Sequence, residues 1–232
     1  MREIVLDTET TGLSPKDGHR IVEIGGVELF NHIPTGKTYH QYINPERDMP
    51  PEAFNVHGLS EEFLRKHPVF AKIAEEFIEF VGDGILVIHN AKFDMSFINA
   101  ELSYVKHPPI PEEQALDTLE IARKKHPMGP NSLDALCRRY GVDNSGRTKH
   151  GALLDSELLA DVYIELIGGR QHDLAIEQGA STTMSGGQRP VATRRQPRPV
   201  PLPSRLSEEE QKAHEMFVSG LGDNALWQRY RD

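Results

Sequence analysis

Two carboxylates directly follow a short apolar run near the start of the chain, and this feature constrains the fold most strongly. Residues 4–6 (Ile-Val-Leu) have the length and β-branched character of a strand that is buried on both faces. Asp7 and Glu9 come next, and Gly12 then permits a tight turn. Because residues two apart in a strand project to the same side, both carboxylates should lie on one face of the sheet.

Two acids at the end of a buried strand repel each other and resist the loss of water. A bound cation removes this cost, so the pair predicts a divalent-metal site. Ligands that are all oxygen atoms favour magnesium or manganese over zinc. The alternative is that Asp7 and Glu9 are solvated acids at a strand end, and the metal interpretation therefore needs partner ligands elsewhere in the chain.

Candidate partners occur in two later segments. The apolar run 85–88 leads into the sequence HNAKFD, which places Asp94 where a strand gives way to a helix, a common ligand position in α/β sheets. The second segment, TKHGALLD, contains His150 and Asp155. Five residues on a helix correspond to a rotation of about 140°, so His150 should lie in the loop before the helix, as Gly151 allows.

The order of the apolar patterns indicates an α/β domain with a mixed sheet that ends near residue 169. Three strands joined by short turns predict an antiparallel meander, and strands and helices then alternate. Pro50, Pro51 and residues 56–59 are interpreted as loop, and Ser60 as the start of a helix. The predicted strands are 3–7, 20–30, 37–43, 85–88 and 115–116, and the predicted helices are 69–81, 93–105, 133–140 (closed by Gly141) and 152–167.

Charge and cysteine usage narrow the functional classes. The formal charge of −9 argues against a large, non-specific nucleic-acid surface, although it allows a small local site. The single Cys137 has apolar neighbours, which favours a packing role and fits a reducing cytosol. The acidic start lacks the pattern of a signal peptide, and no apolar run is long enough to span a bilayer. We therefore expect a cytoplasmic protein that does not enter a membrane.

The composition changes after residue 169. Residues 170–206 are rich in Pro, Gly and Arg and poor in large apolar side chains, which predicts a flexible linker. Ser207 and Glu210 form a capping-box pattern that starts a short apolar tail over residues 207–232. A tail of this length cannot form its own core, so it should dock on a partner or back on the first domain. The expected docking residues are Phe217, Leu221, Leu226 and Trp227.

The three acidic motifs together resemble those of the DEDDh exonucleases, a ribonuclease H-like family. The resemblance covers the first domain closely and the tail loosely, and it also includes the segments DTETTG and NVHGLS. It implies a five-stranded sheet of order 3-2-1-4-5 whose second strand is antiparallel to its neighbours. It further implies that Asp7, Glu9, Asp94 and Asp155 hold two Mg²⁺ or Mn²⁺ ions and that His150 is the general base. The implied activity is 3′-5′ hydrolysis that proofreads DNA and releases nucleoside 5′-monophosphates.

The resemblance also implies contacts with substrate and partners. The implied contacts to the 3′ end of DNA are Thr8, Leu13, His57 and Phe93, and each of these side chains could instead belong to the core or a loop. Gln171, Leu174 and Ile176 lie where the family carries a sliding-clamp contact, and a solvated linker is the alternative. The tail would bind the α subunit of DNA polymerase III, and a small θ-like subunit is a further implied partner.

Three rival functions share parts of this pattern. An exoribonuclease of the oligoribonuclease or ribonuclease T type would have the same acidic residues without needing the linker and tail. A stand-alone DNA-repair exonuclease would share both site and substrate. A non-catalytic adaptor that stabilises a polymerase would not need all five of the acidic and histidine side chains.

Overall fold

The computed structural model describes residues 1–147, 149–169 and 207–221 of the chain. These residues fall in two units, one within residues 1–177 and the other within 178–232, and each is described by itself. The predicted clamp contacts Gln171, Leu174 and Ile176 and the tail residues Leu226 and Trp227 lie outside the described residues. Among the helices of the described parts, none combines the length and apolarity needed to cross a bilayer.

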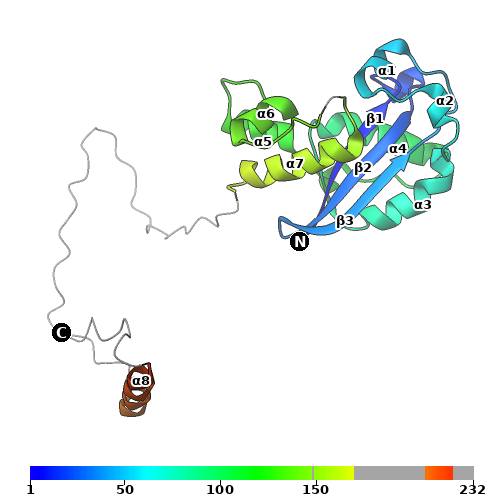
Figure 1. Ribbon diagram of the computed structural model, residues 1–232. Helices are drawn as coiled ribbons and strands as arrows, with labels where there is room; N and C mark the ends of the chain where they lie inside the picture. The colour runs from blue at the N-terminus through cyan, green and yellow to red at the C-terminus, as the bar shows by residue number, and fades with distance from the viewer. Residues whose placement is uncertain (148, 170–206, 222–232) are drawn as a thin grey trace, which may run out of the picture. The chain divides into compact units, whose positions relative to one another are not determined.

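The first unit is built on a five-stranded sheet of order β3-β2-β1-β4-β5 (Figure 1). β2 pairs antiparallel with both β1 and β3, whereas β4 is parallel to β1 and β5 is parallel to β4. The predicted strand order, the meander and the antiparallel second strand are therefore confirmed. The strands are β1 (Arg2–Thr10), β2 (Ile21–Phe30), β3 (Ile33–Tyr42), β4 (Ile85–Ile88) and β5 (Ala115–Asp117).

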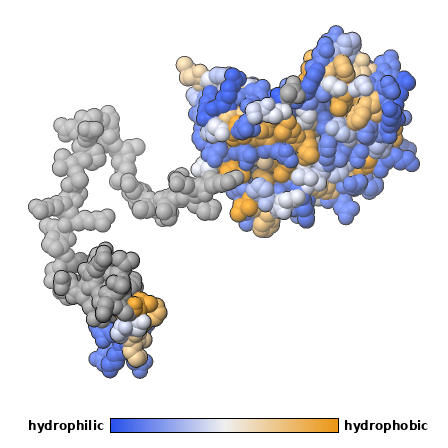
Figure 2. Space-filling view, viewed as in Figure 1, coloured by the Kyte–Doolittle hydropathy of each residue, from blue (hydrophilic) through white to orange (hydrophobic). Residues whose placement is uncertain are grey.

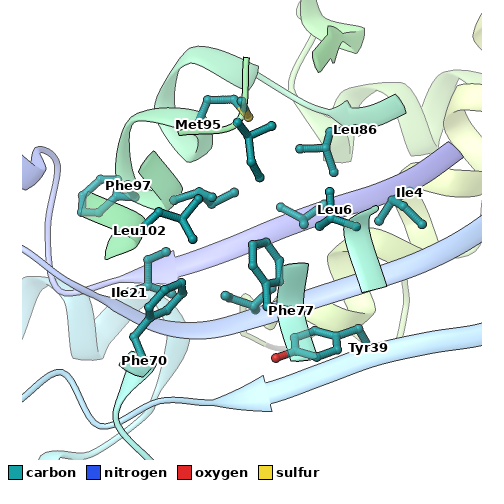
Figure 3. Packing of buried hydrophobic residues seen from close by; sticks show 14 of the residues in the cluster. Ile4, Leu6, Ile21, Tyr39, Phe70, Phe77, Leu86, Met95, Phe97 and Leu102 are labelled. Carbon is teal, nitrogen blue, oxygen red and sulfur yellow. The ribbon is translucent and has the colours of Figure 1, made fainter. Parts of the chain in front are cut away.

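Helices cover both faces of this sheet. Ile4 and Leu6 of β1 pack with the apolar faces of α3 (Phe70–Val81) and α4 (Ala91–Tyr104), as Figure 3 shows. Val5 points to the opposite face and packs with Leu159 and Tyr163 of α7 (Ala152–Leu166). β1 is therefore buried on both faces, as its sequence predicts.

The remaining helices of this unit flank α7 or precede α3. α6 (Leu133–Tyr140) begins after Ser132, whose side chain accepts from Ala135 N–H, and ends at Gly141 with φ of 70°, as predicted. α6 and α5 (Thr118–Lys125) pack with α7 through a cluster that includes the buried Cys137, which confirms its packing role. α2 (Glu61–Leu64) begins after Ser60, whose side chain accepts from Phe63 N–H.

Two helices differ from the sequence expectation. Pro51 and the stretch before Gly58 are not loop, because they form α1 (Pro51–His57). Proline suits the first helical position, since its missing N–H would have no partner there, and Gly58 ends the helix with φ of 76°. Only His57 of this helix is buried, so α1 has no apolar stripe that a pattern could reveal. α5 was likewise not predicted.

The second unit is described only for α8 (Glu208–Gly220) and its flanking residues. The predicted capping box is confirmed, because the side chains of Ser207 and Glu210 each bond the other's backbone N–H. Phe217 and Leu221 are exposed, and Figure 2 shows α8 with both hydrophilic and hydrophobic surface. An exposed apolar side on a short helix is the feature expected of a segment that docks on a partner.

Candidate functional site

Asp7 and Glu9 lie on the α7 side of the sheet. Both have the same parity along β1 as Val5, which packs against α7, and successive side chains of a strand alternate between faces. Glu9 is buried, and one of its oxygens lies within 4.8 Å of ligand atoms of His150 and Asp155. The two strand acids therefore project toward the segment that contains the third acidic motif.

Asp94 reaches the site from the first turn of α4, directly after β4. Its Oδ1 accepts hydrogen bonds from the backbone N–H of Thr8, at 3.1 Å, and from the Thr8 hydroxyl, at 2.7 Å. These bonds fix the Asp94 carboxylate, whose charge acts on Asp7. Thr8, which the sequence predicts as a substrate contact, is thus also a support for a candidate ligand.

Asp155 occupies the equivalent position on α7, in the first turn of that helix. α7 lies unusually close to β2, because a Cβ on Gly25 would come within 2.2 Å of the backbone of Ala152 and Leu153. Gly25 is paired with Asp7 across the β1–β2 ladder. The absence of a side chain at Gly25 therefore lets the N-terminus of α7 bring Asp155 close to the strand acids, as the pKa of Asp7 also reflects.

His150 lies in the loop before α7, as predicted, and Gly151 caps the helix in an extended conformation with φ of −155°. The His150 Nδ1 is 3.2 Å from Asp155 Oδ2. Its backbone N–H donates to the Val56 carbonyl at 3.3 Å, and the neighbouring Lys149 ammonium donates to the Asn55 carbonyl. The C-terminal part of α1, which sequence patterns did not reveal, is therefore what anchors the His150 loop.

Arg147 is a residue of the site that the sequence interpretation missed. Its Nε and Nη2 donate to the two oxygens of Asp155, both at 2.6 Å, and its Nη1 donates to Asp134 Oδ1 at 2.7 Å. Its Nη2 also lies 2.7 Å from His150 Nδ1. The only signal in the sequence is a pair of cations, Arg147 and Lys149, in the segment between α6 and α7 next to a predicted cluster of acids, and such a signal does not indicate which cation pairs with which acid.

The carboxylates differ in how readily they ionise. Burial raises the pKa of Asp7 well above its usual value, and the charges of Asp94, Glu9 and Asp155 raise it further. Burial and the charge of Asp155 raise the pKa of Glu9 to about 8, and burial raises that of Asp94 to about 7 despite the Thr8 bonds. Burial opposes ionisation of Asp155 too, but its contacts with His150 and Arg147 lower its pKa below the usual value.

These properties fit a divalent cation. The buried carboxylates keep protons near neutral pH because their ionised forms are unfavourable without a neighbouring cation. The donor set is mainly carboxylate oxygen, which suits hard ions. A guanidinium already pairs with both oxygens of Asp155, so a cation is favourable at that carboxylate.

A cavity of about 520 Å³ adjoins the acids and shares Glu9 with them. This volume lies within the range of small-molecule sites, roughly 300–1,000 Å³. Leu13 is 86% exposed at its edge. Burial lowers the pKa of His57 to about 4, and Nδ1 of this histidine accepts from Leu59 N–H, so the ring is neutral with its proton on Nε2. The cavity brings together all four predicted substrate contacts, Thr8, Leu13, His57 and Phe93.

The comparisons with known proteins agree with this geometry. The Exonuclease (RNase_T) family model matches residues 4–163. DNA polymerase III subunit epsilon of Rickettsia felis is 47% identical over 224 residues, which cover 95% of this chain and 97% of that protein. The protein of the same name from Escherichia coli K12 is 43% identical over 242 residues and covers 97% of both chains.

Solved structures show the same fold. Exonuclease X in complex with 5′ overhanging duplex DNA has a TM-score of 0.56 and 25% identity, and the match covers 71% of this chain and 90% of that one. The nuclease domain of 3′hExo, described as a DEDDh family member bound to rAMP, has a TM-score of 0.61 and 18% identity, with 72% and 91% coverage.

Proposed function

The chain belongs to the Exonuclease (RNase_T) family, and from this premise we propose that it is the 3′-5′ proofreading exonuclease of a bacterial replicative DNA polymerase. One observation carries the proposal: the identity of 43% to an epsilon subunit of DNA polymerase III extends over 97% of both chains. It therefore includes the region after the nuclease domain, which a ribonuclease with the same acidic site would not need.

The acids on β1, α4 and α7 would hold the divalent metal on which the family depends, and we propose two ions, Mg²⁺ or Mn²⁺. When bound, such ions stabilise the attacking and leaving oxygens of a displacement at phosphorus. Asp7, Glu9, Asp94 and Asp155 supply the carboxylates, and Thr8 orients Asp94. The protons that Glu9 and Asp94 hold near neutral pH would leave as the ions bind.

His150 is the proposed general base. Its Nδ1 faces Asp155, so its Nε2 is the nitrogen left to remove a proton from the attacking water. If the Nδ1 proton is donated to Asp155 Oδ2 in the working site, the ring holds the tautomer that a base at Nε2 requires. Water attacks phosphorus as His150 takes up its proton, the bond between phosphorus and the 3′ oxygen breaks, and that oxygen takes up a proton to become a 3′-hydroxyl. The products are a nucleoside 5′-monophosphate and a DNA strand that is one nucleotide shorter.

The cavity beside Glu9 is the proposed site for the terminal nucleotide. Leu13 and Phe93 offer apolar surface on which a base can stack or wedge, and His57 offers a neutral Nε2–H as donor. Ala53 and Val56 of α1 add further apolar lining to this cavity. Exposed apolar groups at the edge of an acidic cavity favour an unpaired base over a duplex end.

The partners are proposed from the relatives and from the tail. The names of the relatives place them in DNA polymerase III, so the α subunit is the proposed partner of Phe217, Leu221, Leu226 and Trp227. A sliding clamp at Gln171, Leu174 and Ile176, and a small θ-like subunit, remain predictions. A location in the bacterial cytoplasm is also proposed, because the chromosome that the relatives replicate lies there.

A primer assay tests this function directly. The full chain is given primers with a matched or a mismatched 3′ end, with Mg²⁺ or EDTA, and with or without the candidate polymerase. We expect metal-dependent release of 5′-monophosphates, faster from the mismatched end, and a further gain with polymerase because tethering raises the effective concentration. Equal digestion of both primers in the presence of polymerase would contradict proofreading.

Two further arms separate the rival functions. Matched RNA and DNA oligomers distinguish the proposal from an exoribonuclease, which would degrade RNA faster. A chain that lacks residues 207–232 should still digest short single-stranded DNA within about twofold of the wild-type rate but should lose the polymerase in co-purification, because an anchoring apolar segment is removed. Normal polymerase binding by the truncated chain would contradict the tethering role, and absence of all nuclease activity in the full chain would favour the adaptor.

A further inference from the structure

The proposed mechanism leaves one buried group of the site unused, the guanidinium of Arg147. Its side chain is 8% exposed, and it forms two parallel bonds of 2.6 Å with the Asp155 carboxylate, which is itself 3% exposed. A guanidinium that binds both oxygens of a carboxylate in this way neutralises it as a bound cation would. Asp155 cannot offer both oxygens to Arg147 and also bind a metal ion with full strength.

The same guanidinium controls the proton on His150. Arginine can only donate hydrogen bonds, so the 2.7 Å contact between Arg147 Nη2 and His150 Nδ1 makes Nδ1 the acceptor. In a neutral imidazole the proton then lies on Nε2, the nitrogen that must be free if His150 acts as a general base. In this arrangement His150 is not ready for proton transfer at Nε2.

A third contact gives Arg147 another carboxylate to pair with when its bonds to Asp155 break. Its Nη1 donates to Asp134 Oδ1 at 2.7 Å, and Asn144 donates to the same oxygen at 3.1 Å. Asp134 is on α6, outside the set of candidate metal ligands, and its side chain is 46% exposed. Arg147 can therefore release Asp155 and His150 without becoming an unpaired buried cation.

We propose that Arg147 is a positioning residue that holds the metal-free site in a resting arrangement, as a counter-ion for Asp155 and a donor to His150 Nδ1, and that it yields Asp155 when a divalent ion binds. The inference rests on the proposed metal-dependent function. After exchange, Nδ1 is free to donate to Asp155 Oδ2, already 3.2 Å away, and Nε2 becomes the base. Metal loading and readiness of the base are thereby coupled through one side chain.

Mn²⁺ affinity of the full chain tests the competition. We expect Arg147→Gln to bind Mn²⁺ about tenfold more tightly than wild type in calorimetric titration, because the charge-assisted pair no longer has to be broken. The matched control is Arg20→Gln, since Arg20 makes an equivalent pair with Glu101, with both bonds 2.7 Å long, away from the acids. The control should lower the melting temperature and leave Mn²⁺ affinity unchanged.

A milder pair of variants keeps the test valid if a glutamine variant fails to fold. Arg147→Lys keeps the charge but loses the two-pronged geometry, so Mn²⁺ binding should tighten by a smaller factor, while Arg20→Lys should not change it. Unchanged or weaker Mn²⁺ binding in the Arg147 variants overturns the inference, because Arg147 would then support metal binding. Failure of the wild-type chain to bind Mn²⁺ at all would instead contradict the proposed function.

The ¹⁵N signals of the His150 ring give a readout that does not depend on activity. In metal-free wild-type protein at pH 8 they should show the proton on Nε2, and in metal-free Arg147→Gln the population should shift toward Nδ1–H. Loss of the signals in His150→Ala assigns them. A proton on Nδ1 in the metal-free wild-type protein would overturn the inference.

Discussion

The two sides of the acidic site keep their carboxylates in different ways. On the β1 and α4 side, burial raises the pKa values of Asp7, Glu9 and Asp94, and neighbouring acids raise those of Asp7 and Glu9 further, so these acids hold protons at a pH where exposed carboxylates are ionised. On the α7 side, Asp155 has a lowered pKa and is paired with Arg147. Without metal, one side limits its charge by protonation and the other by pairing.

This difference means that one kind of substitution has opposite consequences on the two sides. Removing a charge from the β1 side relieves repulsion, whereas removing the charge of Asp155 leaves a buried guanidinium with one partner fewer. Both changes should damage metal binding. The stability of the variants without metal should therefore distinguish the two sides of the site more clearly than their activity does.

The largest expected effect is on turnover. Asp7→Asn should lower metal-dependent release of 5′-monophosphates by more than about 10³-fold, because a ligand to the ions that stabilise the reacting oxygens is lost. Melting of the metal-free protein should be unchanged or slightly higher, because repulsion is relieved. Glu62→Gln, an exposed acid of α2, is the control and should behave as wild type in both assays. Wild-type turnover in Asp7→Asn would exclude this residue as a ligand.

His150→Ala should lower turnover by about 10²–10⁴-fold through loss of the general base. Mn²⁺ affinity should remain within about threefold of wild type, since the proposed ligands are carboxylates. Calorimetric titration and single-turnover kinetics on the same preparation measure both quantities. Because His150 lies within 4.8 Å of ligand atoms of Glu9 and Asp155, a large loss of Mn²⁺ affinity would identify it as a ligand instead.

Asp155→Asn should reduce the free energy of unfolding of the metal-free protein by about 3 kcal/mol, as expected when one partner of a buried ion pair is removed. Asp7→Asn should change it by about 0 to +1 kcal/mol, because no buried cation loses its main partner. Urea unfolding in EDTA gives both values. Equal destabilisation by the two variants would mean that the sides of the site do not differ as described.

The stability of the metal-free protein should fall as the pH rises from 5 to 8, by about 1.4 kcal/mol per pH unit for each acid that keeps a proton in the folded state and has lost it in the unfolded chain. The raised pKa values mean that the folded state keeps protons that the unfolded chain loses near pH 4, so higher pH favours unfolding until the folded acids ionise, at about 7 for Asp94 and about 8 for Glu9. Asp155 acts oppositely: its lowered pKa adds stability that is lost only below its usual value of 3.8.

Urea unfolding in EDTA at several pH values measures this dependence. Glu9→Gln should flatten the upper part of the curve, near pH 8, and Asp94→Asn the part near pH 7. Stability that is constant or rises across this range in the wild-type protein would contradict the raised pKa values.

Sequence patterns predicted the features that depend on residues close together in the chain. The acids were found because each lies directly after a buried strand or at the start of a helix, and the sheet order came from the family resemblance. Arg147 was missed because its importance depends on three partners brought together by folding, at Asp134, His150 and Asp155. α1 was missed because only His57 is buried there, so no apolar period marks it.

The role of each predicted contact residue remains harder to infer than its position. Thr8, Leu13, His57 and Phe93 do line one cavity, yet Thr8 also holds Asp94 and Phe93 packs on Phe97, with ring centroids 5.0 Å apart. A residue that supports the core and faces the substrate at once gives the same sequence signal as one that only packs. Substitutions measured with and without DNA are needed to separate the two roles.

The close contact at Gly25 has a consequence for how the enzyme tolerates sequence change. Where α7 meets β2, backbone rests on backbone, and Ser156 bonds the Gly25 carbonyl at 3.0 Å. The spacing between the strand acids and Asp155 is therefore set by main-chain atoms that every sequence shares, and not by the volumes of interchangeable core side chains. Core residues can therefore be replaced without changing the spacing of the catalytic acids. Replacing Gly25 even by alanine should displace α7.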